Sequence, residues 1–131
     1  MRLLLDTHIW IWSLSEPTRL SKRVAAELEA PGNELWLSPI STWEALLLIE
    51  RGRLQVTGTP ERVVAGMLAA GPFQEASLTH AVVVESRRIR GRHADPADRF
   101  LAATARVYDL TLVTGDHRLL SIKEIDRLAN R

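Results

Sequence analysis

Short apolar segments, each followed closely by acidic or turn residues, constrain the fold of this chain more than any other feature. Residues 2–5 form an apolar run that predicts a strand buried on both faces. Residues 34–37 and 111–113 predict two further strands, and residues 73–76 predict a short one. Segments with helical character separate them, so the sequence predicts an α/β domain with a mostly parallel central sheet.

The predicted helices are bounded by residues that commonly end or begin a helix. A Pro-Gly-Asn turn at 31–33 ends the helix predicted over 21–30, and Gly52 ends the helix predicted over 41–51. The clearest helix is predicted over 95–108. Further helical segments are predicted over residues 10–14, 60–70 and 78–89, and from about residue 121 onward.

The composition fits one folded domain over residues 1–131, with 46% hydrophobic and 25% charged residues. The absence of cysteine excludes disulfides and thiolate metal sites and favours a cytoplasmic location. No apolar stretch approaches the roughly 18–20 residues of a membrane span, and the first residues do not form a secretory signal. The net charge is only +1, and fifteen of the seventeen basic residues are arginine. That bias suits phosphate binding, although a GC-rich genome produces it equally well.

Four acidic residues fall where a parallel α/β sheet places its ligands, outside the carboxyl ends of the strands. Asp6 follows the first predicted strand, and Asp116 follows the late one. Glu44 and Asp98 lie in the first turns of their predicted helices. We therefore expect the four carboxylates to meet in one pocket.

Most of these acids also have a purely structural interpretation. Ser41 and Glu44 have the spacing of a capping box, in which Glu44 binds the backbone at the start of its helix. Asp95, followed by proline, has the pattern of an N-cap. Asp98 would then complement the helix dipole, and Asp116 would hold a turn.

Taken together, the acids favour a metal site. Asp6 has no capping role, because it ends a buried strand. Two unit charges about 4 Å apart repel by about 4 kcal/mol at an effective dielectric constant near 20, so clustered carboxylates need protons or a cation. Oxygen ligands suit Mg²⁺ or Mn²⁺. Such sites support metal-assisted hydrolysis of phosphodiesters.

The order of these motifs resembles that of the PIN-domain ribonucleases. More narrowly, it is similar to the small PIN proteins that serve as toxins of VapBC-type toxin–antitoxin pairs. The resemblance covers nearly the whole chain. It is carried by Asp6-Thr7, Ser41-x-x-Glu44, Asp95-Pro96-Ala97-Asp98-Arg99 running into residues 101–105, and Thr114-Gly115-Asp116.

The resemblance implies a three-layer α/β/α sandwich and a Mg²⁺-dependent endoribonuclease in which Mn²⁺ can substitute. It further implies an RNA substrate, a homodimer, and a cognate antitoxin that inserts a segment into the active-site groove. Asp95 and Asp98 both precede the same helical segment, so either can be the third metal-site acid, and we align Asp98. The implied catalytic and metal-binding residues are Asp6, Glu44, Asp98 and Asp116, with Thr7, Asp95 and Thr114 in support.

Basic residues before and within the helix at 95–108 are candidate RNA contacts. Arg92 and Arg99 are the predicted substrate-binding residues, since arginine binds phosphate near an acidic pocket. The competing interpretation is a solvated helix end whose basic residues complement the dipole. The apolar residues 46–49 are compatible with a dimer contact. Trp43, in the first turn of the same predicted helix, is expected in the core.

Other functions that use clustered acids fit the sequence less well. A receiver-type phosphoacceptor needs a lysine after the late strand, and none is present there. A haloacid-dehalogenase-like phosphatase needs Asp-x-Asp after the first strand, where this chain has Asp6-Thr7-His8. A catalytically silent PIN fold that binds RNA or acts as a scaffold remains the alternative to an enzyme.

Overall fold

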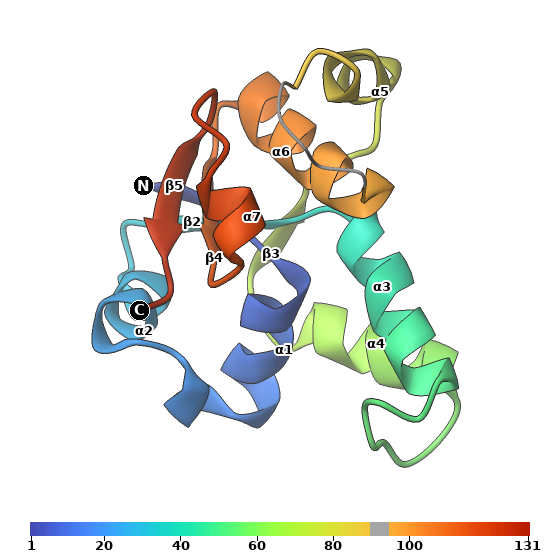
Figure 1. Ribbon diagram of the computed structural model, residues 1–131. Helices are drawn as coiled ribbons and strands as arrows, with labels where there is room; N and C mark the ends of the chain where they lie inside the picture. Colours follow the sequence, from blue (N-terminus) through green and yellow to red (C-terminus); the bar gives the residue numbers. More distant parts are fainter. Residues whose placement is uncertain (90–94) are drawn as a thin grey trace.

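A parallel five-stranded sheet lies at the centre of the computed structural model, which describes residues 1–89 and 95–131 (Figure 1). Within these residues, no helix is long and apolar enough to cross a membrane. The elements are β1 (Arg2–Leu5), α1 (Thr7–Ser15), the 3₁₀ turn η1 (Pro17–Arg19), α2 (Lys22–Glu29), β2 (Glu34–Leu37), α3 (Pro39–Glu50), α4 (Pro60–Ala69), β3 (Phe73–Glu75), α5 (His80–Ser86), α6 (Pro96–Tyr108), β4 (Thr111–Thr114), α7 (His117–Leu120) and β5 (Asp126–Ala129).

The strand order, β3-β2-β1-β4-β5, places β1 in the middle of the sheet. Leu3 pairs with Leu35 of β2 on one side and Thr111 of β4 on the other. The chain winds outward in one direction from β1 to β3 and in the other from β4 to β5. The gap between β1 and β4 is therefore the switch point at which parallel sheets form a ligand crevice.

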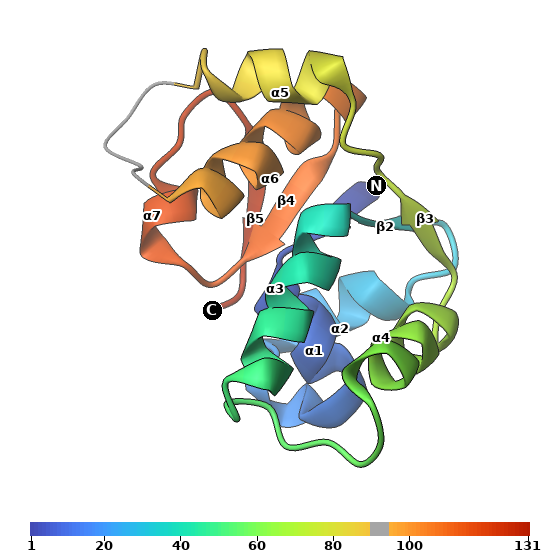
Figure 2. The same cartoon turned by 90° about the vertical axis from the view of Figure 1, so that its right-hand side faces the viewer.

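Two hydrophobic cores, one on each face of the sheet, make the fold a three-layer α/β/α sandwich. Successive strand residues point to opposite faces, so Leu4 joins one core and Leu3 and Leu5 join the other. The Leu4 core is closed by α5, α6 and α7, and the opposite core is closed by α1 to α4 (Figure 2). The three-layer sandwich with a parallel sheet, predicted from the sequence, is confirmed.

Helix α6 is buried around most of its circumference in its middle part, where its residues are small or apolar. Leu101, Ala102, Ala103 and Ala105 are all buried. The helix begins as predicted, with Asp95 Oδ1 accepting a hydrogen bond from the backbone N–H of Ala97 at 2.9 Å. This cap fixes the first turn of α6 at the carboxyl edge of the sheet.

The start of α3 differs from the prediction. The helix begins at Pro39, and Ser38 caps it by accepting a hydrogen bond from the N–H of Ile40 at 3.1 Å. Ser41 therefore lies inside the helix and is buried, so the capping-box interpretation of Ser41 and Glu44 is wrong. A proline at the first helical position and a serine before it are also start signals, and they extend the helix by two residues.

The C-terminal prediction was wrong as well. Residues from about 121 onward do not form a helix; α7 is already complete at Leu120, and the chain then adds the edge strand β5. In β5 only Leu128 is buried. An edge strand with one buried side chain has no apolar alternation that periodicity can detect. The shorter helix predicted at 10–14 is in fact α1, which begins at Thr7 directly after β1.

Candidate functional site

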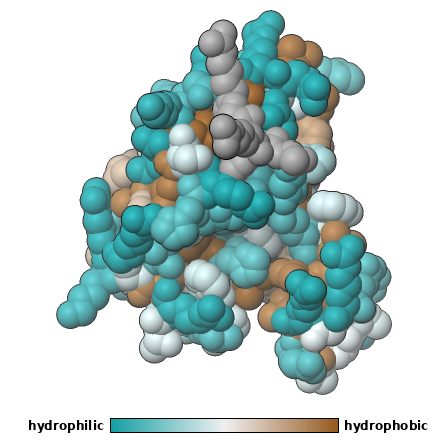
Figure 3. Space-filling model, viewed as in Figure 1, coloured by the Kyte–Doolittle hydropathy of each residue, from teal (hydrophilic) through white to brown (hydrophobic). Residues whose placement is uncertain are grey.

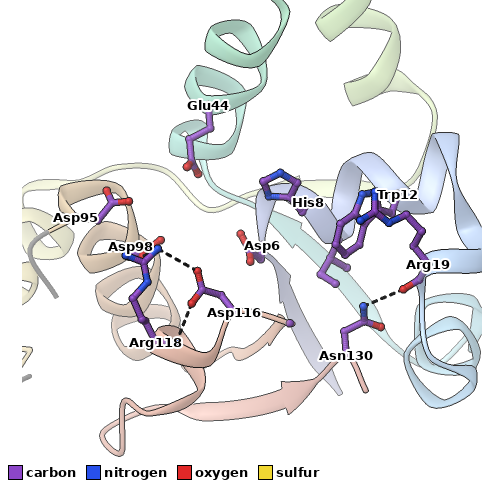
Figure 4. A pocket seen from close by; sticks show the side chains of 12 residues that line it. Asp6, His8, Trp12, Arg19, Glu44, Asp95, Asp98, Asp116, Arg118 and Asn130 are labelled. Atoms are coloured by element: carbon purple, nitrogen blue, oxygen red, sulfur yellow. Dashed lines mark hydrogen bonds and ion pairs between the residues drawn. The ribbon is translucent and has the colours of Figure 1, made fainter. Parts of the chain in front are cut away.

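A cavity of about 610 Å³ opens at the carboxyl edge of the sheet, above the switch point between β1 and β4. Five carboxyl groups from four separate segments line it (Figure 4). The structure thus brings together the acids that the sequence placed at this edge. They are Asp6 after β1, Glu44 of α3, Asp95 and Asp98 at the start of α6, and Asp116 after β4.

Asp6 lies at the floor of the cavity because its backbone continues the sheet. Its N–H donates to the carbonyl of Val113 at 3.0 Å. Its Oδ2 accepts a hydrogen bond of 2.6 Å from the hydroxyl of Thr114, a fully buried residue. Burial raises the pKa of Asp6, although the hydrogen bond from Thr114 partly offsets this effect. Asp6 is thus held rigidly in a place where its negative charge is poorly solvated.

Glu44 is held by a hydroxyl pair beneath it rather than by the helix start. The hydroxyl of Thr7 donates to Glu44 Oε1 at 2.6 Å and lies 3.0 Å from the hydroxyl of Ser41. Burial raises the pKa of Glu44, and the negative charges of Asp6 and Asp95 add to the shift. The role of Ser41 is therefore to support Thr7 and, through it, the Glu44 carboxylate.

Asp98 is the acid whose burial is least offset by hydrogen bonds. It is 7% exposed, and its buried Oδ2 accepts no hydrogen bond from any residue that the structure describes. Burial, followed by the negative charges of Asp95, Asp116 and Asp6, raises its pKa to about 7. A buried carboxylate oxygen without a donor is costly, so this position is suited to a proton or a cation.

Asp116 lies closer to the surface, and its carboxylate is hydrogen-bonded by a residue two positions along the chain. Its Oδ1 accepts the N–H of Arg118 at 2.8 Å, which caps α7, and its Oδ2 lies 3.5 Å from Nη2 of the same arginine. These interactions lower the pKa of Asp116, although burial opposes them. The same Nη2 lies 4.0 Å from Oδ2 of Asp98. Among the residues that the structure describes, Arg118 is the one that forms ion pairs with two of the acids, and sequence reasoning missed it.

The predicted supporting and substrate-binding residues lie in different places. Thr7, Thr114 and Asp95 all contact or border the acids. Arg99 is not among the residues that line the cavity; its guanidinium donates to the carbonyls of Ser86 at 3.1 Å and Ile89 at 2.8 Å, at the carboxyl end of α5. Arg92 lies outside the described residues.

The wall opposite the acids was not predicted. It consists of His8 and Trp12 on α1, Arg19 on η1, and Asn130 just after β5 (Figure 4). His8 and Trp12 are four residues apart and so share one face of α1. That spacing, directly after Asp6, is the signal from which these two residues could have been found. Asn130 gave no such signal, because it follows the strand that the sequence did not predict.

The acids fit a hard divalent cation by their chemistry. Mg²⁺ prefers oxygen ligands, and burial raises the pKa values of Asp6, Glu44 and Asp98, so their negative charges are poorly solvated. Among the described side chains, no three are already arranged to hold one ion. Arg118 lies against two of the acids, so a cation that uses Asp98 and Asp116 would displace its guanidinium.

Comparison with known proteins identifies the family. The profile of the PIN domain matches residues 3–127. A curated relative, Ribonuclease VapC22 of Mycobacterium tuberculosis, is 32% identical over 123 residues, which are 91% of this chain and 90% of the relative.

Solved structures share the fold. A chain of VapBC2 from Rickettsia felis, crystallised with a DNA fragment from its promoter, superposes with a TM-score of 0.74 at 18% identity and covers 98% of both chains. A chain of FitAcB from Neisseria gonorrhoeae superposes with a TM-score of 0.65 at 26% identity, covering 98% of this chain and 97% of its own. The profile match over residues 3–127 and the 32% identical relative show that the chain belongs to the PIN-domain family.

Proposed function

We propose that this protein is a metal-dependent endoribonuclease that hydrolyses RNA phosphodiester bonds as the toxin of a VapBC-type pair. The observation that carries the proposal is the convergence of Asp6, Glu44, Asp98 and Asp116 on one cavity, where the buried Oδ2 of Asp98 accepts no hydrogen bond from the described residues. The 32% identity to Ribonuclease VapC22 supports RNA as the substrate. An RNA substrate in turn supports a cytoplasmic location.

Mg²⁺, or Mn²⁺ in its place, would be held by these four acids. Such a cation lowers the pKa of a bound water and polarises the scissile phosphate. The chain supplies the orientation: Thr114 holds Asp6, and Thr7 holds Glu44, each through a 2.6 Å hydrogen bond. Fixed outer donors of this kind tune the acids that they contact.

We assign Asp98 rather than Asp95 as the third metal-site acid. Asp95 already accepts the N–H of Ala97 at 2.9 Å as the N-cap of α6. Oδ2 of Asp98 accepts no hydrogen bond from the described residues. The acid whose buried oxygen accepts no hydrogen bond is the better ligand, and Asp95 supports it from the rim of the cavity.

An antitoxin and a second copy of the chain are the proposed protein partners. The solved structures with this fold include VapBC complexes. Helix α3 is rich in apolar residues, yet only Ser41 and Ala45 are buried in it, and Trp43 is 53% exposed. The expectation of Trp43 in the core was therefore wrong. Hydrophobic patches interrupt the hydrophilic surface on the side of α3 and α4 (Figure 3). An apolar helix with exposed faces favours a protein contact.

A catalytically silent RNA-binding module is the second candidate. It is favoured by Arg118, which lies within 4.0 Å of both Asp98 and Asp116 and partly neutralises them without a metal. The two candidates differ in whether a divalent cation binds at the acids.

The deciding experiment is a calorimetric titration of Mn²⁺ into the antitoxin-free protein and its Asp6→Asn variant. Asp126→Asn, on the exposed edge strand β5, is the matched control. We expect the parent and the control to bind Mn²⁺ and Asp6→Asn to lose binding while keeping its fold. Absence of Mn²⁺ binding by the parent at millimolar concentration would favour the silent module. Cleavage of total RNA with Mg²⁺, abolished by EDTA, then tests the activity itself.

A further inference from the structure

The cavity has two chemically different halves, and the acids use only one of them. The other half consists of His8 and Trp12 with the guanidinium of Arg19, and we call it the aromatic wall. We propose that the aromatic wall binds a nucleobase of single-stranded RNA adjacent to the scissile phosphate. The inference rests on the proposed ribonuclease function and adds a base-binding subsite to it.

The aromatic wall is a set of flat groups in mutual contact. The ring centroids of His8 and Trp12 are 5.6 Å apart, and their planes are inclined by 51°. The guanidinium carbon of Arg19 lies 4.2 Å from the centroid of the Trp12 ring, in a cation–π arrangement. His8 and Arg19 are exposed, and Trp12 is partly buried. Planar groups open to solvent beside an active site are surfaces on which nucleobases stack.

The aromatic wall is fixed relative to the acids by hydrogen bonds. Asn130 accepts the N–H of Ser21 at 2.7 Å and donates to the carbonyl of Arg19 at 3.1 Å. The backbone N–H of Asn130 donates to the carbonyl of Thr114 at 2.9 Å. Thr114 also holds Asp6. A single residue therefore connects the turn that carries Arg19 to the strand end that positions the catalytic acid.

The chemistry of the aromatic wall favours RNA over a basic peptide. Its cationic group, Arg19, attracts phosphate and repels lysine or arginine side chains. Its nearest carboxylate partner, Glu16, lies 3.7 Å from Arg19 and is itself exposed, so the guanidinium keeps a free approach to solvent. Histidine, tryptophan and arginine are also the side chains on which unpaired bases stack. A basic peptide segment would instead contact the acids on the opposite side.

The test compares the protein's affinity for an RNA strand with its affinity for the same ribose–phosphate backbone without bases. A fluorescent single-stranded RNA and the same strand built from abasic ribose are bound to the protein in EDTA, which prevents cleavage, and affinities are read by anisotropy. We expect the parent to prefer RNA over the abasic strand, and His8→Ala and Trp12→Leu to reduce that preference by about 5- to 150-fold. Trp36→Leu, a partly buried tryptophan with Arg2 over its ring and outside the lining of the cavity, is the matched control and should keep it.

If Trp12→Leu unfolds, His8→Ala decides the test, because His8 is exposed and its replacement should leave the fold intact. A preference for RNA that survives in His8→Ala and in a folded Trp12→Leu overturns the inference. So does an equal loss of affinity for both strands, because it indicates a backbone contact. Variants that bind RNA like the parent but lose antitoxin binding also overturn it, and assign the aromatic wall to the protein partner. If the parent shows no base preference yet cleaves RNA with Mg²⁺, this inference fails alone. If the parent neither binds nor cleaves RNA, the proposed function fails with it.

Discussion

Asp98 and Asp116 face the same arginine, which lowers the pKa of both, yet the two pKa values shift in opposite directions. The Asp98 side chain is 10% exposed with Arg118 Nη2 at 4.0 Å, and the Asp116 side chain is 31% exposed with the same atom at 3.5 Å. The pKa of Asp98 is raised to about 7, mainly by burial, and that of Asp116 is lowered by the hydrogen bonds from Arg118. The burial of each carboxyl group and the hydrogen bonds that it accepts therefore decide its charge. The more deeply buried side of the cavity, where Asp98 lies, is the side that needs a cation.

The largest expected effect is on cleavage, which should require the deep and the shallow acids equally. Asp6→Asn and Asp116→Asn each remove a carboxylate charge at the proposed metal. We expect each to lower the rate of RNA cleavage by at least about 100-fold, beyond the 10- to 100-fold typical of outer-shell changes. The measurement is the single-turnover rate with Mg²⁺ for variants of verified fold. Retained cleavage by either folded variant would contradict the assignment.

Thr114 contacts both the buried Asp6 and the more exposed Asp116, so replacing it tests whether the metal site needs the two acids held together. Its hydroxyl donates to Asp6 at 2.6 Å and accepts the N–H of Asp116 at 3.0 Å. Thr114→Val keeps the shape and deletes both contacts. We expect a loss of about 10- to 100-fold in Mn²⁺ affinity or cleavage rate. Thr104→Val, also buried but bonded only within α6 at 2.7 Å to Phe100, is the control for burying the extra methyl group.

The raised pKa of Asp98 predicts how the metal-free protein responds to pH. The folded-state pKa, about 7, exceeds the ordinary value of 3.8, so the folded state binds the extra proton between these values. The free energy of unfolding should therefore fall as pH rises through this range, by at most about 1.4 kcal/mol per pH unit for one proton. Thermal unfolding in EDTA at pH 5 and pH 8 measures this loss.

Asp98→Asn is the matched variant for the pH experiment, because its side chain is neutral at both pH values. We expect it to be more stable than the parent at pH 8 in EDTA and to show a smaller pH dependence. An unchanged pH dependence would mean that Asp98 is already charged at neutral pH, and the contrast with Asp116 would disappear.

Arg118→Ala should give the smallest effect. The guanidinium competes with a cation for Asp98 and Asp116, but its side chain is 66% exposed, and solvent screens exposed ion pairs so that they contribute little. We expect Arg118→Ala to tighten Mn²⁺ binding by up to about 5-fold in calorimetry. Arg23→Ala, an exposed arginine on α2, should leave it unchanged. Weaker Mn²⁺ binding by Arg118→Ala would show that the arginine assists the site rather than competing for it.

The sequence predicted the part of the site that depends on strand ends. Asp6 and Asp116 could be placed because apolar runs mark β1 and β4, and parallel strands deliver the residues after them to one edge of the sheet. The N-cap role of Asp95 was also readable from the proline after it and is confirmed. These features depend on local patterns of a few residues.

The features that the sequence could not supply depend on tertiary contacts. Glu44 is oriented by Thr7, 37 residues away, and no local pattern links the two. Trp43 has a core-like composition around it but lies on an exposed face of α3. The edge strand β5, with one buried side chain, has no periodic signal, and the position of Asn130 in the cavity was lost with it.

The hydrogen bond between Asn130 and Ser21 spans 109 positions of the chain, and this separation has a kinetic consequence. Closing the loop between them costs conformational entropy, and this contact forms only after β5, directly before Asn130, has paired with β4. The edge strand that precedes Asn130 has little buried area and can exchange its amide protons through local opening. The cavity would then lose the connection between its two halves while the α6 layer stays folded. We therefore expect this connection to be the last part of the molecule to assemble and the first to open.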